Sequence, residues 1–239
     1  MKSRKNAFFI RFFRPYVKFL LKKHFYRVHI NDQAWSSTKG SKLFLPNHSN
    51  WWDGLVIFYL NEAVTKQDSY SMMSEDGLKQ FPFFGKIGAF PVSDSPKKLL
   101  ASLKYAIELI KEEKSIWIFP QGKEEHLEKR PFHFMNGPAY LIDKQPGIEV
   151  YPIAFYYTFM HDQKPELFIK IGTAVNGEKL AHKEKNQITE ELADRLERLV
   201  DEVREHAMEG ERSHYRILVN GRKTISEWLQ WWKQLGGIK

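Results

Sequence analysis

Short apolar runs alternate along this chain with stretches whose apolar residues recur at three- and four-residue steps, a pattern typical of an α/β layer architecture. Strands are expected at residues 43–45, 69–74, 89–92, 116–119, 149–157 and 167–171. Helices are expected at residues 54–64, 75–84, 96–114 and 188–208. With 239 residues and 42% hydrophobic content the chain can bury one substantial core, so a single α/β domain is the simplest interpretation.

The first 27 residues carry a pattern of their own. Seven apolar residues mark one face of a helix and four basic residues mark the other: Phe9, Phe12, Phe13, Tyr16, Val17, Leu20 and Leu21 against Arg11, Arg14, Lys18 and Lys22. The longest apolar run has four residues, too short for a signal peptide or for a transmembrane helix, which needs about 20. We predict that residues 1–30 form a basic amphipathic helix, or two divided at Pro15, that contacts a membrane. The alternative is a helix docked on the core with a solvated basic side.

Positive charge is concentrated in the same segment. Nine of the 37 Lys and Arg residues lie in the first 27 positions, with no acid among them, which leaves 28 basic and 29 acidic residues in the rest. The net charge of +8 therefore belongs to the N-terminus, where it favours anionic headgroups. Nucleic-acid binding is not expected, because the aromatic residues form a helix face instead of interleaving for base stacking.

Two further features bound the function. The chain has no cysteine, which excludes disulfides, thiolate nucleophiles and cysteine-based zinc sites and fits an intracellular protein. Near the C-terminus, helical spacing and a flanking Trp231 mark a second apolar helix face, formed by Ile225, Trp228, Leu229 and Trp232. Tryptophan suits both a membrane boundary and a core, so the pattern leaves both locations open.

Candidate chemistry is carried by His48 and Asp53, which follow the apolar run 43–45 and have four residues between them. A His and an Asp delivered to a sheet edge just before a helix can share a hydrogen bond. Asp53 would then fix the tautomer of the ring while the other ring nitrogen takes a proton from an alcohol. On this hexapeptide alone, a satisfied surface histidine is the commoner outcome.

Four blocks, in order, resemble the glycerolipid acyltransferase family: Asn47-His48 through Asp53-Gly54, Gly88 to Val92, Phe119-Pro120-Gln121-Gly122, and Val150 to Ala154. The resemblance implies an α/β fold with a single mixed sheet flanked by helices, with residues 31–239 as the acyltransferase domain. It implies O-acyltransferase activity with His48 as general base and Asp53 as its orienting partner. It also implies substrate contacts from Asn47, Phe90, Phe119, Pro120, Gln121 and Gly122. No covalent acyl-enzyme is required, in keeping with the absence of Cys and of a Gly-x-Ser-x-Gly elbow.

The chain departs from the family pattern where the acceptor is chosen. The family commonly continues its third block as Glu-Gly-Thr-Arg, where this chain has Gln121-Gly122-Lys123-Glu124, and often has an Arg at the position of Asp94. Both arginines are associated with the acceptor's phosphate, the natural partner of a guanidinium. Lys86 and Lys123 are the cations that can compensate. The acceptor is therefore 1-acyl-glycerol-3-phosphate or a neutral hydroxyl, such as that of a glycolipid or glycosylated terpenoid.

The remaining expectations concern cofactors, location and the competing function. His126, His133 and His161-Asp162 match no metal-ligand spacing, so no metal is predicted. No cofactor is expected beyond acyl-CoA or acyl carrier protein as co-substrate. We expect peripheral attachment to the cytoplasmic face of a membrane; the sequence does not define the oligomeric state. The competing hypothesis is a catalytically silent lipid-binding protein of the same fold, suggested by Gln121 and Glu124.

Overall fold

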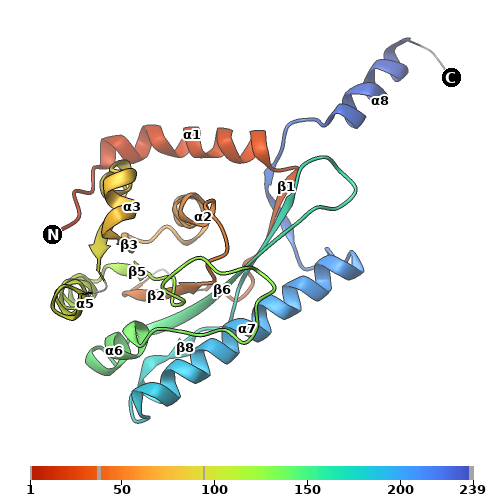
Figure 1. The fold of residues 1–239 in the computed structure, drawn as a ribbon. Helices are drawn as coiled ribbons and strands as arrows, with labels where there is room; N and C mark the ends of the chain where they lie inside the picture. Colours follow the sequence, from red (N-terminus) through yellow and green to blue (C-terminus); the bar gives the residue numbers. More distant parts are fainter. Residues whose placement is uncertain (1, 37–38, 94, 237–239) are drawn as a thin grey trace.

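The computed structural model describes residues 2–36, 39–93 and 95–236, and within them one mixed sheet forms the centre of the molecule (Figure 1). Its strands are β1 (Arg27–Asn31), β2 (Lys42–Pro46), β3 (Ser69–Ser74), β4 (Ala89–Val92), β5 (Ser115–Trp117), β6 (Glu149–Thr158), β7 (Glu166–Ile171), β8 (Val175–Asn176) and β9 (Arg216–Asn220). They lie in the order β4-β3-β5-β2-β6-β7-β1-β9, with β8 paired to β6. The half from β4 to β6 is parallel, whereas β7 and β8 run antiparallel to β6 and β9 runs antiparallel to β1.

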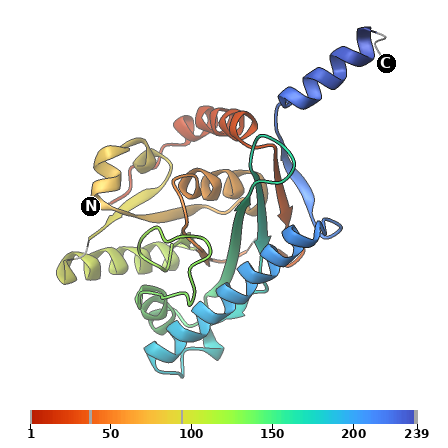
Figure 2. The same ribbon diagram turned by 45° about the vertical axis from the view of Figure 1, so that its right-hand side comes forward.

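Helices cover both faces of this sheet (Figures 1 and 2). The helices of the described residues are α1 (Ala7–His24), α2 (Asp53–Leu60), α3 (Glu75–Gln80), α4 (Phe83–Lys86), α5 (Pro96–Lys111), α6 (Gly137–Lys144), α7 (Lys185–Glu209) and α8 (Ile225–Gly236), of which α8 does not lie on the sheet. Short helical turns at Asn61–Thr65 and Gly177–Lys179 complete the set. Helices α1 and α2 pack on one face, while α5, α6 and α7 pack on the other. The alternation along β2 serves both layers, since Phe44 joins the first core and Leu43 and Leu45 join the second.

The predicted mixed α/β architecture is confirmed. The expected helix at 75–84 is wrong in one respect, because the chain breaks at Phe81 and Pro82 into α3 and α4. Proline has no N–H to continue the helical ladder and disfavours helical backbone in the residue before it. Strands β1, β8 and β9 were not predicted, and β1 runs through residue 30, the expected limit of the N-terminal segment.

Helix α1 is continuous through Pro15 and divides its apolar residues between two environments. Val17 and Leu21 are buried against the sheet, and the Phe13 ring lies 5.2 Å from that of Phe58 and 5.3 Å from that of Phe83. A second row stays exposed: Phe8, Phe12, Tyr16 and Phe19. Helix α1 is therefore docked on the core along one row, while its aromatic second row and its basic residues stay exposed.

Candidate active site

The site begins where the chain leaves β2. Asn47, directly after the strand, is buried and exchanges two hydrogen bonds with the backbone of Phe155 in the neighbouring β6. Its Nδ2 donates to the Phe155 carbonyl at 3.0 Å, and its Oδ1 accepts from the Phe155 N–H at 2.7 Å. The Asn47 amide thus extends the β2–β6 ladder by one residue and fixes the direction in which His48 leaves the sheet.

Asp53 is the centre of the next turn, and its carboxylate is fully buried. Oδ2 accepts three hydrogen bonds: 2.8 Å from His48 Nδ1, 2.7 Å from the Ser49 N–H and 3.0 Å from the Asn50 N–H. Oδ1 accepts a fourth from the Tyr157 hydroxyl at 2.7 Å. As the first residue of α2, Asp53 also lies at the positive end of the helix dipole. A buried charge is tolerated only when it is hydrogen-bonded, and this one is bonded on both oxygens.

The His48 ring is held from two sides. Nδ1 donates to Asp53, and the ring stacks on Phe119 with centroids 4.1 Å apart and planes at 19°. Nε2 is then the nitrogen that carries the lone pair in a neutral ring, and with the side chain 20% exposed it is the one available to a substrate. The arrangement is that of an oriented general base.

Gln121 ties the turn after β5 to this histidine. The Gln121 side chain is buried; its Oε1 accepts from the His48 N–H at 2.6 Å and its Nε2 donates to Glu125 Oε2 at 3.4 Å. The Glu125 N–H in turn donates to the His48 carbonyl at 3.0 Å. Lys129, hydrogen-bonded to Glu125, lowers the pKa of that carboxyl. A glutamate at position 121 would place two carboxylates together, so the glutamine is explained by its neighbour.

The turn 119–122 has its own constraint at Gly122. This residue has φ +75°, a left-handed conformation that favours glycine, and a Cβ there would lie 3.0 Å from Met135 Cγ. The Gly122 N–H donates to the Phe119 carbonyl at 3.1 Å, and Pro120 has no N–H. Neither residue therefore offers a free amide to a substrate oxygen.

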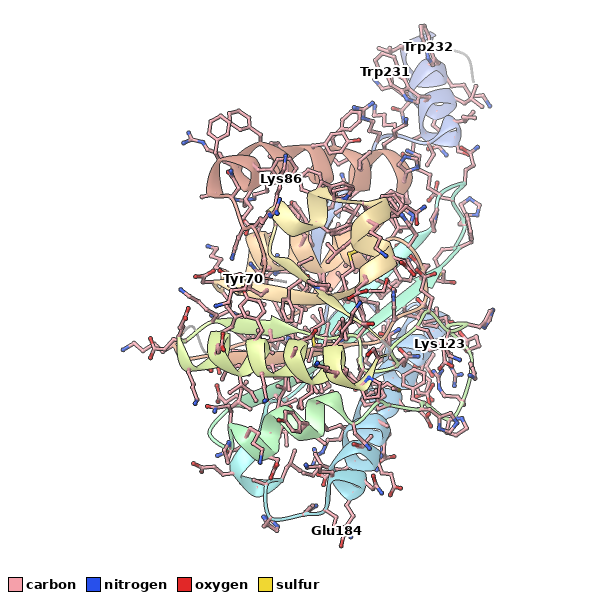
Figure 3. All side chains as sticks on the ribbon, turned by 60° about the vertical axis from the view of Figure 1, so that its left-hand side comes forward. Tyr70, Lys86, Lys123, Glu184, Trp231 and Trp232 are labelled. Carbon is pink, nitrogen blue, oxygen red and sulfur yellow. The ribbon has the colours of Figure 1, made fainter. Side chains whose placement is uncertain are left out.

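The other predicted substrate contacts lie in three different places. Phe90 is fully buried in the core against Tyr105, 5.1 Å between ring centroids. Lys86 ends α4 and lies over the Phe9 ring of α1, whereas Lys123 is exposed with Nζ 3.9 Å from Glu125; Figure 3 shows the two lysines well apart. Glu124, by contrast, brings Oε1 to 3.9 Å from His48 Nε2. Asp94 lies outside the described residues.

Tyr157, like Glu125, is a site residue that could not be predicted from the sequence. It stands near the end of β6, 104 positions after Asp53, and only the β2–β6 pairing brings the two together. Burial, together with the Asp53 carboxylate, raises the pKa of Tyr157 well above its ordinary value, so the phenol stays a donor. Its ring lies 6.0 Å from that of Phe25, which packs at 5.1 Å against Trp52. Trp52 also contacts His24 at the end of α1, so the turn before Asp53 rests on that helix.

The described residues contain neither a membrane-spanning helix nor a metal-binding cluster. No helix there is long and apolar enough to cross a bilayer. No group of three or more His, Cys, Asp or Glu side chains is arranged to hold a metal ion in that part of the chain.

An imidazole oriented by a buried carboxylate, at the edge of a mixed α/β sheet, is the arrangement found in enzymes that activate an alcohol for transfer. The model of the Acyltransferase family matches residues 26–156, more than half of the chain and a stretch that contains both turns of the site. The chain belongs to this family, which confirms the glycerolipid acyltransferase resemblance, and the protein is an O-acyltransferase.

One solved structure gives the same fold. The crystal structure of the 1-acyl-sn-glycerophosphate (LPA) acyltransferase PlsC from Thermotoga maritima is similar with a TM-score of 0.59 and 15% identity, over 82% of this chain and 78% of the other. No curated protein matched the sequence.

Proposed function

We propose that this enzyme transfers a fatty acyl group from an acyl thioester, acyl-CoA or acyl carrier protein, to a hydroxyl of a membrane lipid. The observation that carries the proposal is the His48 ring, held by Asp53 and Phe119 with Nε2 accessible. In the reaction Nε2 takes the proton of the acceptor hydroxyl as its oxygen bonds to the thioester carbonyl carbon. The C–S bond then breaks, and the proton passes from His48 to the leaving thiolate, giving an ester and a free thiol.

For the acceptor we favour a neutral hydroxyl, as on a glycolipid or glycosylated terpenoid, over lysophosphatidate. Glu124 lies beside the nitrogen that would receive the proton, where its carboxylate can accept hydrogen bonds from neighbouring hydroxyls. It would repel a phosphate charge about 5 Å away by roughly 1 kcal/mol in a solvent-exposed setting. Lys86 lies against α1 and Lys123 against Glu125, so the contacts of these two cations do not favour a phosphate at His48.

The enzyme would act as a peripheral protein on the cytoplasmic face of a membrane, attached through α1. The exposed aromatic row of α1 is accompanied by Arg11, Arg14, Lys18 and Lys22, a combination suited to a bilayer interface with anionic lipid. The contact of His24 with Trp52 supports attachment through α1, because it connects this helix to the turn that carries His48 and Asp53.

The test is acyl transfer by the purified full-length protein from labelled palmitoyl-CoA and palmitoyl carrier protein to acceptors in mixed vesicles. The acceptors are lysophosphatidate and a monoglucosyl lipid. We expect the glucosyl lipid to be acylated, and His48→Ala to lose at least about 10²-fold in rate. The matched control is His182→Ala, an exposed histidine before α7.

Each other outcome has a meaning. A preference for lysophosphatidate would overturn the neutral acceptor and leave acyl transfer standing; Glu124→Arg would then change little. If the neutral acceptor is right, Glu124→Arg should shift the preference toward lysophosphatidate, and Glu124→Gln should not. Tight lipid binding without transfer from either thioester would favour the silent lipid-binding hypothesis.

A further inference from the structure

Helix α8 projects from the body instead of packing on it (Figures 1 and 2). Six of its large apolar side chains are between 37% and 65% exposed: Ile225, Trp228, Leu229, Trp231, Trp232 and Leu235. Figure 3 shows Trp231 and Trp232 on the part of α8 that stands clear of the sheet and helices. The core location that the sequence left open for these tryptophans is therefore excluded, and the helix presents an uncovered apolar surface.

The base of α8 is nevertheless fixed. Thr224 is buried, its hydroxyl donates to Asp162 Oδ1 at 3.2 Å, and its N–H donates to Glu227 Oε2 at 2.8 Å. The Ile225 N–H donates to Gln163 Oε1 at 3.1 Å, so the start of the helix is bound to the loop between β6 and β7. The direction of α8 is thus set at its first turn.

The same base is joined to the end of α1. The Arg222 N–H donates to the Lys22 carbonyl at 2.9 Å, and the Arg222 guanidinium lies over the Phe19 ring, 4.6 Å from its centroid. At Gly221 a Cβ would lie 2.1 Å from the Phe25 carbonyl oxygen, so only glycine permits this close approach. Phe19 is the last residue of the exposed aromatic row of α1. Helices α1 and α8 lie on the same side of the molecule in all three views.

The charges around α8 indicate what kind of partner covers its apolar surface. Lys223 lies over the rings of Trp228 and Trp231, at 5.3 and 5.1 Å, and Lys233 is exposed near the far end. Glu227, the acid of this helix, is committed to Thr224 and Tyr26. A second copy of the chain would bring the same cations against these, whereas anionic headgroups complement them. Tryptophan with flanking lysine suits the wet boundary of a bilayer.

We propose that α8 is a second membrane-contacting helix, which inserts its tryptophans into the interface of an anionic bilayer beside α1. This inference rests on the membrane location proposed above. It gives the enzyme two attachment points on one side, joined through Arg222 and Lys22. Two joined contacts bind more tightly than either alone, because the second forms at a high effective concentration.

The experiment is sedimentation of the full-length protein with phosphatidylcholine vesicles containing phosphatidylglycerol, and with pure phosphatidylcholine. For the double variant Trp228→Ala/Trp232→Ala we expect partition to anionic vesicles to fall at least about tenfold. Met208→Ala, which truncates an exposed apolar residue at the end of α7, should bind as the wild type does. Acylation of detergent-dispersed acceptor should be unchanged in both.

The outcomes separate this inference from the proposed function. Failure of the wild-type protein to bind either vesicle would overturn the membrane location itself, while acylation in detergent tests the chemistry independently. Loss of binding in Phe8→Ala/Phe12→Ala with normal binding in the α8 variant would overturn the role of α8 alone. So would a dimer, seen by sedimentation velocity without vesicles, that the tryptophan substitutions abolish while vesicle binding persists.

Discussion

The turn from Asn47 to Asp53 and the helix α8 differ in how firmly their side chains are held. In the turn both Asp53 oxygens and the side chain of Asn47 have hydrogen-bond partners, and the His48 ring is stacked as well. In α8 the first turn is fixed and six apolar side chains remain uncovered. On the proposed roles, geometry is fixed in advance at the site of the reaction, whereas the apolar surface of α8 is left for the membrane to cover.

The largest effect should come from breaking the turn at its centre. Asp53→Asn keeps the size of the side chain, but it replaces one acceptor oxygen with a donor, so the His48 tautomer is no longer enforced. We expect kcat to fall on the order of 10²–10⁴-fold with little change in KM. Asp76→Asn, an exposed carboxylate on α3, is the control, and an Asp53→Asn rate within about threefold of wild type would contradict the role of Asp53.

A second change tests the link between the two turns. Gln121→Glu would set two carboxylates against each other and raise the pKa of one of them above its unfolded value. A raised folded pKa favours the protonated state, so the destabilisation, about 1 kcal/mol, should grow as pH rises from 4 toward 7 and shrink in acid. Melting curves across that range measure it. The exchange Gln121→Glu/Glu125→Gln should restore stability; a pH-independent loss would refute the explanation.

Removing one donor from Asp53 should cost less. Tyr157→Phe leaves three hydrogen bonds on the carboxylate, and we expect kcat to fall about tenfold, the value of one hydrogen bond to a charged group. Tyr156→Phe, on the opposite face of β6, is the control. An unchanged kcat would make Tyr157 a packing residue only.

The smallest effect is expected in the peripheral helix. Trp232→Ala should change the free energy of unfolding by less than about 0.5 kcal/mol, since the side chain contributes no core contact. Trp117→Ala, in the buried strand β5, should cost about 3–5 kcal/mol. Denaturant titration compares the two, and similar losses would mean that α8 packs on the body in solution.

The residues of this site that lie close together in the sequence could be predicted, whereas its long-range contacts could not. His48 and Asp53 could be predicted because one short turn contains both. Tyr157 could not, since its contact depends on β6 lying next to β2, and strand order leaves no trace in periodicity. Phe90 sits on the strand of the second block, yet its side chain faces the core.

Contacts between residues far apart in the sequence explain why strand β1 was not predicted. Strand β1 contains the buried polar residues His29 and Asn31, which make it look solvent-facing. His29 is satisfied by a hydrogen bond to the buried Glu166, a partner 137 positions away. For α1 and α8, helical periodicity predicts which residues form the apolar face but not what covers that face. In the structure one row of α1 is buried, whereas the apolar side chains of α8 stay exposed.

The neighbouring parallel strands β2 and β5 deliver the two turns of the site side by side. The turn after β2 carries His48, and the turn after β5 carries Gln121, which accepts a hydrogen bond from the His48 N–H, and Glu124, whose Oε1 lies 3.9 Å from His48 Nε2. If His48 is the base and Glu124 selects the acceptor, as proposed, reaction and selectivity reside on separate segments of the chain. Under the proposed function, a substitution at position 124 would be the way to change the acceptor alcohol, while Gln121 would continue to hold the backbone of His48.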